Sequence, residues 1–180
     1  MNLAGIDSSG GFKYIAIVVC EADKLRDVFL ALDLRPGFHM RKHDINMKRK
    51  VALTFIKAVK EVPQLKILCI QAGINHLARS LARKYRMPRT KALNKVLRLC
   101  QREIFKLLGK FDVKEVHYDS ELTPAVNGFH GRTILKGPAT TLADILAWIN
   151  LRRSYLDIDE SGAIIFINLE KKFRKMLRLD

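Results

Sequence analysis

The chain has 180 residues, long enough to bury a sizeable core, and this length favours a single domain over residues 1–180. It carries 33 Lys and Arg against 18 Asp and Glu, and the resulting net charge of +15 attracts polyanions such as nucleic acid. No apolar run approaches the roughly 18 residues that a membrane span needs, and no targeting segment is visible. We therefore expect a cytoplasmic protein that does not bind membranes.

The predicted elements begin with a β-hairpin. Residues 3–6 form a short apolar strand with Asp7 at its tip, a run of Ser and Gly supplies the turn, and residues 12–19 are β-branched and aromatic. Residues 28–34 are predicted to form a third strand, which a Pro-Gly pair ends.

The remaining elements are predicted from the spacing of apolar residues and from Pro and Gly stops. In chain order they are a helix over 45–62, a strand over 65–70, a short and a long helix within 74–110 separated at Met87-Pro88, a strand over 113–118, a loop over 121–138, a helix over 141–153 and a tail helix over 168–179. Three early strands followed by helices interleaved with strands predict an α/β fold. Its mixed sheet would start with the antiparallel hairpin, continue with parallel strands and be flanked by helices.

Cysteine usage indicates a reduced protein. Cys20, Cys69 and Cys100 lie within apolar periodic stretches, are odd in number and show no paired spacing. This pattern argues against both a disulfide framework and a zinc site. We expect three thiols in the core and no disulfide-linked partner.

The segment over 74–110 is strongly basic. Between Arg79 and Lys110 eleven residues are basic and one, Glu103, is acidic. Five cations fall in one stripe of the predicted long helix, opposite an apolar stripe: Lys91, Lys95, Arg98, Arg102 and Lys106. Solvated helices intersperse acids among their cations, because like charges one turn apart repel each other. A stripe without those acids favours binding to a phosphate backbone, and a plain solvated face is the alternative.

Three Asp residues lie at strand ends or in an apolar helix. Asp7 and Asp119 each follow a predicted strand, and Asp144 lies within the apolar run Leu142–Trp148. A buried charge is costly unless it is paired or bound to a metal. Turn formation is the alternative for Asp7 and Asp119, and a capping box with Thr141 is the alternative for Asp144. Converging carboxylates suit Mg²⁺ or Mn²⁺, which prefer oxygen ligands.

Two motifs resemble the ribonuclease-H-like superfamily. Gly-Ile-Asp-Ser-Ser-Gly at 5–10 and Leu-Ala-Asp-Ile-Leu-Ala at 142–147 look most similar to a poorly characterised group of nuclease-like proteins within it, whose late helix carries an Ala-Asp pair. Members of the superfamily start with a strand that carries an Asp, continue into a hairpin and present a last catalytic acid from a late helix. The resemblance implies a ribonuclease-H-like fold, with Asp7 as the first acid and Asp144 as the last.

The middle acids depart from the pattern of ribonuclease H. There the middle acid follows the strand after the first helix, where this chain has Gln71-Ala72-Gly73, and Asp119 comes one strand later. Either the strand order differs, or Asp119 is not a ligand and the site is incomplete. The related group has an acid shortly before its first helix, so the resemblance implies Asp44 as a further ligand, with helix capping as the alternative.

Three histidines are candidates for proton transfer near the site, since imidazole titrates near neutral pH. They are His39, His117 and His130. Each has a surface or structural role as its alternative. His130 is the first choice, because it lies in the Gly-rich loop just before the Asp144 helix.

The leading functional hypothesis is a nuclease that hydrolyses phosphodiester bonds. Asp7, Asp119 and Asp144, with Asp44, would hold Mg²⁺ or Mn²⁺ in a two-metal site, and the basic stripe would hold the backbone of the nucleic acid. The alternative is a non-catalytic RNA- or DNA-binding module of the same fold, in which the acids only cap and turn the chain. A third hypothesis is a subunit whose basic helix contacts an acidic protein. Convergence of the carboxylates on a common point separates the first two.

Overall fold

A mixed β-sheet forms the centre of the molecule, whose computed structural model describes residues 1–9, 12–62, 65–156 and 164–179. The described strands are β1 (Asn2–Ser9), β2 (Tyr14–Glu21), β3 (Lys66–Gln71), β4 (Val113–Tyr118), β5 (Arg132–Leu135) and β6 (Ile164–Asn168). Their order across the sheet is β5-β4-β1-β2-β3-β6. The β1–β2 and β2–β3 pairs are antiparallel, and the β1–β4, β4–β5 and β3–β6 pairs are parallel.

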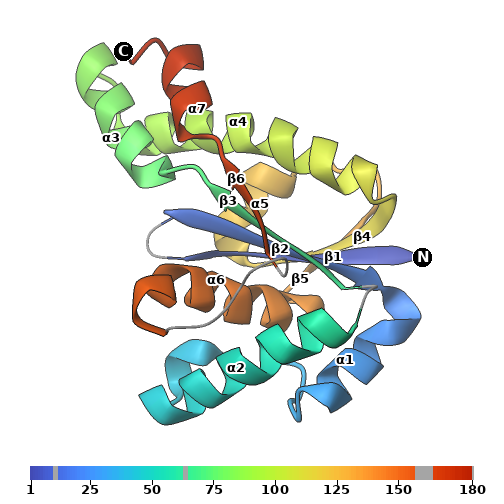
Figure 1. The fold of residues 1–180 in the computed structure, drawn as a ribbon. Helices are drawn as coiled ribbons and strands as arrows, with labels where there is room; N and C mark the ends of the chain where they lie inside the picture. Colours follow the sequence, from blue (N-terminus) through green and yellow to red (C-terminus); the bar gives the residue numbers. More distant parts are fainter. Residues whose placement is uncertain (10–11, 63–64, 157–163, 180) are drawn as a thin grey trace.

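Helices cover both faces of the sheet (Figure 1). One face carries α1 (Leu25–Ala31), α2 (Ile45–Glu61) and α6 (Ala139–Leu156), and the other carries α3 (Ile74–Tyr85), α4 (Arg89–Lys110), α5 (Thr123–Val126) and α7 (Glu170–Met176). Short 3-10 helices η1 (Ala22–Lys24), η2 (Met40–Lys42) and η3 (Ser120–Leu122) lie in the connections. Within the described ranges, no helix is long and apolar enough to cross a membrane.

Side-chain alternation along the strands builds a core on each face. On β2, Ala16 and Val18 point into the core beneath α2 and α6, whereas Ile15 and Ile17 point into the core beneath α3 and α4. This period of two is what a strand buried on both sides requires. The predicted fold class, an α/β mixed sheet with an antiparallel hairpin start and parallel strands, flanked by helices, is confirmed.

The three cysteines are core residues. Cys20, Cys69 and Cys100 are buried and none is in a disulfide. Burial raises the pKa of the Cys20 thiol to about 12, so this sulfur stays protonated at neutral pH.

Residues 28–34 do not form the predicted third strand. They lie in α1 and in the loop that follows it, and the third strand of the chain is β3. Val28, Phe29 and Leu32 are buried against the core of the α2 and α6 face. Their spacing of one, three and four residues places them on one side of a helix, and this burial decided between the two structures that a short apolar run permits.

Residues 121–138 are not one continuous loop. They contain the last two residues of η3 and the whole of α5 and β5, and a further strand, β6, precedes the tail helix α7. The β5 strand has four residues and its side chains are exposed or half-buried, so it lacks the alternation that would have predicted it. Pairing with β4 creates this edge strand.

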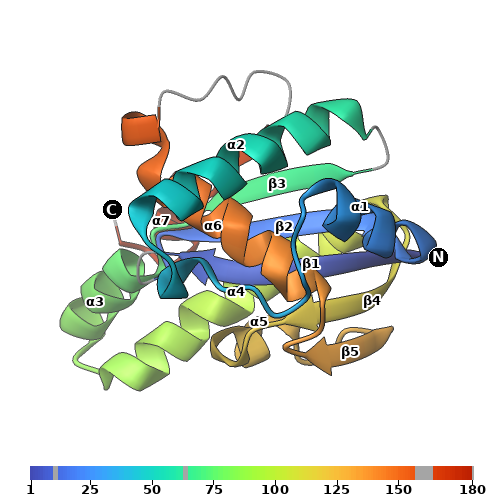
Figure 2. The same cartoon turned by 90° about the horizontal axis from the view of Figure 1, so that it is seen from below.

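Gly5 allows the start of α6 to lie directly on β1 (Figure 2). A Cβ at Gly5 would lie 1.9 Å from the backbone oxygen of Ala139, the first residue of α6. Gly137 has a similar constraint, because a Cβ there would lie 2.5 Å from Cγ of His117. These two glycines therefore set how closely α6 approaches β1 and β4.

We expect Gly5→Ala to lower the free energy of unfolding by about 2 kcal/mol or more, because the added methyl must push the backbone of α6 away from the sheet. Urea denaturation measures this change. Gly109→Ala in α4 is the matched control, since no atom lies within 4 Å of its added Cβ. Equal stability of Gly5→Ala and wild type would contradict the close approach.

Candidate functional site

A cavity of about 200 Å³ lies at the carboxyl ends of β1 and β4. These strands are parallel neighbours in which Ile6 pairs with Tyr118, so the next residues, Asp7 and Asp119, lie side by side. The cavity is lined by Asp7, His39, Arg41, Lys42, Asp119, Glu121, Thr140 and Asp144. Three of the four predicted carboxylates thus meet in one cavity.

Asp7 faces the α6 side of the sheet because side chains alternate along β1. Ile6 is buried in the core beneath α3 and α4, whereas Gly5 contacts Ala139 of α6, so Asp7 shares the face of Gly5. The Oδ1 atom of Asp7 accepts a hydrogen bond of 2.7 Å from the backbone N–H of Ser8. This bond holds the carboxylate at the wall of the cavity.

The carboxyl group of Asp7 has a strongly raised pKa. Its pKa is about 7, and burial is the main cause, although the hydrogen bond from Ser8 opposes it. The negative charges of Asp144, Asp119 and Glu121 also contribute to the raised pKa, in that order. Asp7 therefore lies where an added positive charge would be most favourable.

Asp144 reaches Asp7 because α6 and β1 advance by similar amounts. Ala139 lies on Gly5, and the five residues from Ala139 to Asp144 advance about 7.5 Å along a helix. The two residues from Gly5 to Asp7 advance about 6.8 Å along a strand. The helix lies across β1 and β2 (Figure 2), so the two carboxylates arrive at the same place.

The partners of Asp144 come from the segment before α2, not from its own helix. Oδ2 accepts a hydrogen bond of 2.9 Å from the backbone N–H of Met40 and lies 3.8 Å from Nδ1 of His39. Thr141 accepts a bond of 3.0 Å from the N–H of Gly37. The capping box considered for Asp144 is therefore not formed. Burial raises the pKa of Asp144, and the bond from Met40 and the charge of His39 lower it.

The sheet order resolves the position of the middle acid. Because β4 lies beside β1, Asp119 is the neighbour of Asp7, whereas Gln71 ends β3 two strands away. Asp119 Oδ1 accepts hydrogen bonds from the hydroxyl of Ser120 at 3.0 Å and from the N–H of Glu121 at 3.4 Å, so the residue also caps η3. Asp119 therefore both caps the turn after β4 and lines the cavity.

Glu121 is a fourth acid of the cavity that sequence reasoning did not select. Its carboxylate accepts a hydrogen bond of 3.5 Å from the hydroxyl of Ser8 on β1. Its sequence signal was present, because Glu121 follows Asp119 by two residues at the end of β4. An acid in a loop carries little information until the strand order is known.

Arg41 and Lys42 bring positive charge to the same cavity. They belong to η2, the short helix before α2, together with the buried Met40. The charge of Arg41 lowers the pKa of Asp144, as does that of His39. The cavity thus places cations beside carboxylates, an arrangement that suits an anionic substrate held next to acids.

Asp44 is not brought into the cavity. It is exposed and forms the N-cap of α2, where Oδ1 accepts a hydrogen bond of 2.9 Å from the backbone N–H of Met47. This bond lowers the pKa of Asp44. The capping alternative is the role that the structure gives this residue.

His130 also lies away from the cavity, and His39 is the histidine that lines it. His130 is exposed and precedes β5, which is parallel to β4 and pairs Arg132 with Glu115 near the start of β4. His130 therefore lies near the opposite end of the strand from Asp119. His130 is close to α6 along the chain, but β5 runs between them and carries the chain to the other end of the sheet.

His117, the third histidine, is buried and ties α6 to β4. Its Nδ1 accepts a hydrogen bond of 3.0 Å from the backbone N–H of Ala139, and its Nε2 lies 2.7 Å from Oε1 of Glu115. An Nδ1 that accepts a bond carries no proton, so Nε2 is the donor to Glu115. His117 therefore positions the helix that carries Asp144.

The cavity has the donors of a site for a hard cation but not a closed ligand shell. In the described part of the chain, no three His, Cys, Asp or Glu side chains form a group that is ready to hold a metal ion. Asp7 and Asp144 instead accept hydrogen bonds from nearby backbone N–H groups. Carboxylate oxygens are nevertheless the ligands that Mg²⁺ and Mn²⁺ prefer, and a cation would offset both the burial and the smaller repulsion that raise the pKa of Asp7.

The predicted basic stripe is exposed along α4. The described residues contain no ion pair of Lys91, Lys95, Arg98 or Arg102, and each of these side chains is exposed. Lys106, the fifth member of the stripe, lies 3.5 Å from Glu103. Four cations of the stripe are therefore available for an external anion.

Two grooves run along this stripe. One, of about 720 Å³, is lined by Met87, Thr90, Lys91, Asn94, Lys95 and Arg98. The other, of about 560 Å³, is lined by Asn94, Arg98, Gln101, Thr123, Pro124 and Asn127. They share Asn94 and Arg98, and Thr123 at the start of α5 follows Glu121 of the cavity by two residues. One basic groove and the carboxylate cavity are thus lined by residues two positions apart in the chain, although α4 and α6 lie on opposite faces of the sheet.

The fold resembles that of a solved structure at low sequence identity. No protein-family model matches the chain, and no curated protein matches it. Among solved structures, a chain of the PCNA:RNase HII complex from Archaeoglobus fulgidus is similar, with 16% sequence identity and a TM-score of 0.49. The match covers 99% of this chain and 87% of that chain. Similarity at this level assigns no role to any residue of this chain.

Proposed function

We propose that this protein is a divalent-metal-dependent nuclease that hydrolyses phosphodiester bonds in nucleic acid, with Asp7, Asp119 and Asp144 as metal ligands. The proposal rests on one observation: these carboxylates line one cavity at the ends of two adjacent parallel strands. Glu121 joins them as a fourth acid. Asp44 is left out of the ligand set, because it caps α2 outside the cavity.

The side chains of the cavity would have three roles: to hold the metal, to hold a phosphate and to accept a proton. Mg²⁺ or Mn²⁺, when bound, would activate water and neutralise charge on the phosphate. Asp7 must be ionised to act as a ligand, and its raised pKa makes protons compete with the metal, so metal binding should weaken as the pH falls below about 7. Arg41 and Lys42 would hold a phosphate at the cavity, and His39 could accept a proton beside Asp144.

The basic grooves would hold the backbone that leads to the cavity. Lys91, Lys95 and Arg98 line grooves that continue towards Thr123, and such contacts give affinity without reading sequence. One sheet with helices on both faces supports a single ribonuclease-H-like domain over residues 1–180. The basic helical segment at about 74–110 would be part of that domain.

A second candidate function is a non-catalytic module that binds RNA or DNA. One observation favours it: no ready group of three metal-binding side chains exists among the described residues. In that case the acids of the cavity would serve only structural roles, as the cap formed by Asp119 does.

A cleavage assay tests the proposed function. Labelled single-stranded RNA, single-stranded DNA, both duplexes and a hybrid are incubated with the protein in Mg²⁺, in Mn²⁺ and in EDTA. We expect cleavage of at least one substrate with metal and none with EDTA. Binding without cleavage on every substrate would favour the non-catalytic module, and cleavage in EDTA would contradict the metal site.

Reversing two charges of the stripe should weaken binding of nucleic acid. We expect Lys95→Glu with Arg98→Glu to lower affinity about tenfold or more, and to reduce the slope of log affinity against log salt by about two. Fluorescence anisotropy with labelled oligonucleotides across a salt series measures both. The matched control is Lys24→Glu with Lys114→Glu, which changes the net charge equally at cations already paired with Asp27 and Asp112. Equal losses in both double variants would show that total charge, and not the stripe, governs binding.

A further inference from the structure

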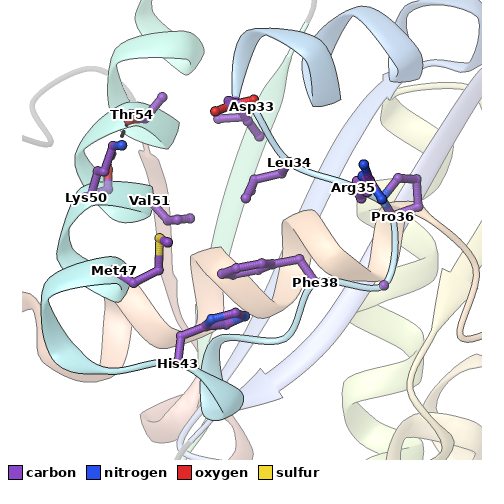
Figure 3. Close-up of a pocket in the computed structure, with 12 residues that line it drawn as sticks. Asp33, Leu34, Arg35, Pro36, Phe38, His43, Met47, Lys50, Val51 and Thr54 are labelled. Carbon is purple, nitrogen blue, oxygen red and sulfur yellow. Dashed lines mark hydrogen bonds between the residues drawn. The ribbon is translucent and has the colours of Figure 1, made fainter.

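A pocket larger than the carboxylate cavity lies between α2 and the loop that follows α1 (Figure 3). Its volume is about 480 Å³, within the range of small-molecule sites. Apolar side chains line its interior, among them Leu34, Phe38 and Val51. Polar residues also line it: Asp33, Arg35, His43, Lys50 and Thr54 (Figure 3). The pocket therefore combines an apolar interior with a few hydrogen-bonding groups.

A stacked pair of rings forms one wall of this pocket. The rings of Phe38 and His43 lie 4.3 Å apart between centroids, with 7° between their planes. Figure 3 shows the two rings parallel, with Leu34 and Val51 pointing towards the face of Phe38 that His43 does not cover. A flat, supported aromatic face is the surface on which a planar ring stacks well.

The pocket and the carboxylate cavity share one backbone segment. Phe38 lines the pocket, and the next residue, His39, lines the cavity. Hydrogen bonds hold this segment to α6, from Gly37 to Thr141 and from Met40 to Asp144. The two sites therefore border the same backbone segment, and consecutive residues line them.

We propose that this pocket binds an unpaired nucleobase of the nucleic acid whose phosphate lies in the carboxylate cavity. The inference rests on the proposed function and adds a substrate preference to it. A base in a duplex has both faces covered by its neighbours and its edge covered by its partner, so it cannot stack on Phe38 without leaving the helix. The substrate is therefore single-stranded or locally unpaired beside the phosphate that is bound.

Charge and polar chemistry favour a nucleotide over a purely apolar occupant. Arg35 and Lys50 line the pocket, and Arg41 and Lys42 line the neighbouring cavity, so cations lie on the path of a phosphate backbone. Asp33 offers an acceptor to the amino groups of bases. An apolar ligand would use none of these groups.

Oligonucleotide binding in EDTA tests the pocket separately from cleavage. The probes are a labelled single-stranded RNA, the same RNA with one abasic site at successive positions, and its duplex. Phe38→Leu keeps the apolar volume but removes the flat face. Thr54→Trp fills the pocket from α2 and leaves the loop intact. Phe166→Leu on β6 is the control, since that aromatic side chain is exposed outside the pocket.

We expect wild type and Phe166→Leu to bind the single strand at least tenfold more tightly than the duplex, and to lose this preference when one particular base is removed. Phe38→Leu and Thr54→Trp should each bind the single strand about tenfold more weakly, with duplex binding unchanged. The proposal that this pocket binds an unpaired base would be overturned if both pocket variants bound the single strand as tightly as wild type does. Equal binding of single strand and duplex by wild type would also overturn it. Base-dependent binding without metal-dependent cleavage would overturn only the nuclease proposal.

Discussion

Replacing Asp7 with Asn is expected to lower metal-dependent cleavage by at least about 100-fold and to leave affinity for nucleic acid unchanged or slightly higher. Groups that merely support metal ligands change activity by 10–100-fold, so loss of a ligand should have a larger effect. Asn keeps the shape of the side chain and an acceptor for Ser8, but it removes a carboxylate that lines the cavity. Single-turnover cleavage and anisotropy with the same oligonucleotide measure the two quantities.

Asp44→Asn is the matched control for this substitution. Asp44 is exposed, lies outside the cavity and caps α2, a role that Asn fills equally well. We expect Asp44→Asn to cleave like wild type. Full activity of Asp7→Asn, or an equal loss in both variants, would contradict the assignment of Asp7 as a ligand.

The stability of the metal-free protein is expected to fall as the pH rises from about 4 to about 7. Asp7 has a pKa of about 7 in the fold against 3.8 as its ordinary value, so in this range the folded state holds a proton that the unfolded chain has released. Binding of this proton stabilises the fold fully below pH 3.8, and the stabilisation is lost as the pH rises above about 7. The difference corresponds to at most about 4 kcal/mol. Urea denaturation in EDTA across this range measures the fall.

Asp7→Asn should remove most of this pH dependence, because Asn does not titrate. The variant should match wild type near pH 4 and exceed its stability above pH 7. Asp144, whose pKa is also raised by burial, should leave a smaller slope in the same direction. A wild-type curve that rises from about pH 4 to pH 7, or an unchanged slope in Asp7→Asn, would show that the carboxyl group is not buried as described.

Long periodic segments of the fold could be predicted from the sequence. The helices α2, α3 and α4 lie where apolar spacing and the stops near Pro88 and Gly109 indicate them. Short elements could not be predicted. The four exposed or half-buried residues of β5 show no pattern, and the apolar residues Val28 and Leu32 fit a strand and a helix equally well. Packing against the sheet decided these cases.

Two acids of the candidate site, Asp7 and Asp144, could be predicted from their local sequence alone. Asp7 follows the apolar run of the first strand, which the structure extends to Ser9, and Asp144 lies inside an apolar helix, so each position makes its carboxylate conspicuous. Asp119 needed the sheet order, because only the pairing of β4 with β1 makes it the neighbour of Asp7. The position of Glu121 depends on the same pairing. His130 looked close to Asp144 along the chain but is separated from it in space.

The segment between α1 and α2 was the least predictable part of the site. Nothing in the sequence of residues 37–42 indicates that the backbone N–H of Met40 donates a hydrogen bond to Asp144. That bond depends on Gly5, which lets α6 approach β1 closely enough to reach the segment. Contacts between segments about a hundred residues apart are set by packing and are absent from local sequence patterns.

Titration of Mn²⁺ into the metal-free protein, followed by the electron paramagnetic resonance of free Mn²⁺ at a pH above 7, tests the central claim most directly. We predict saturable binding by wild type and by Asp44→Asn, and loss of that binding in Asp7→Asn, Asp119→Asn and Asp144→Asn. Equal binding by wild type and Asp7→Asn, or no saturable binding by wild type, would contradict a metal shared by these three carboxylates.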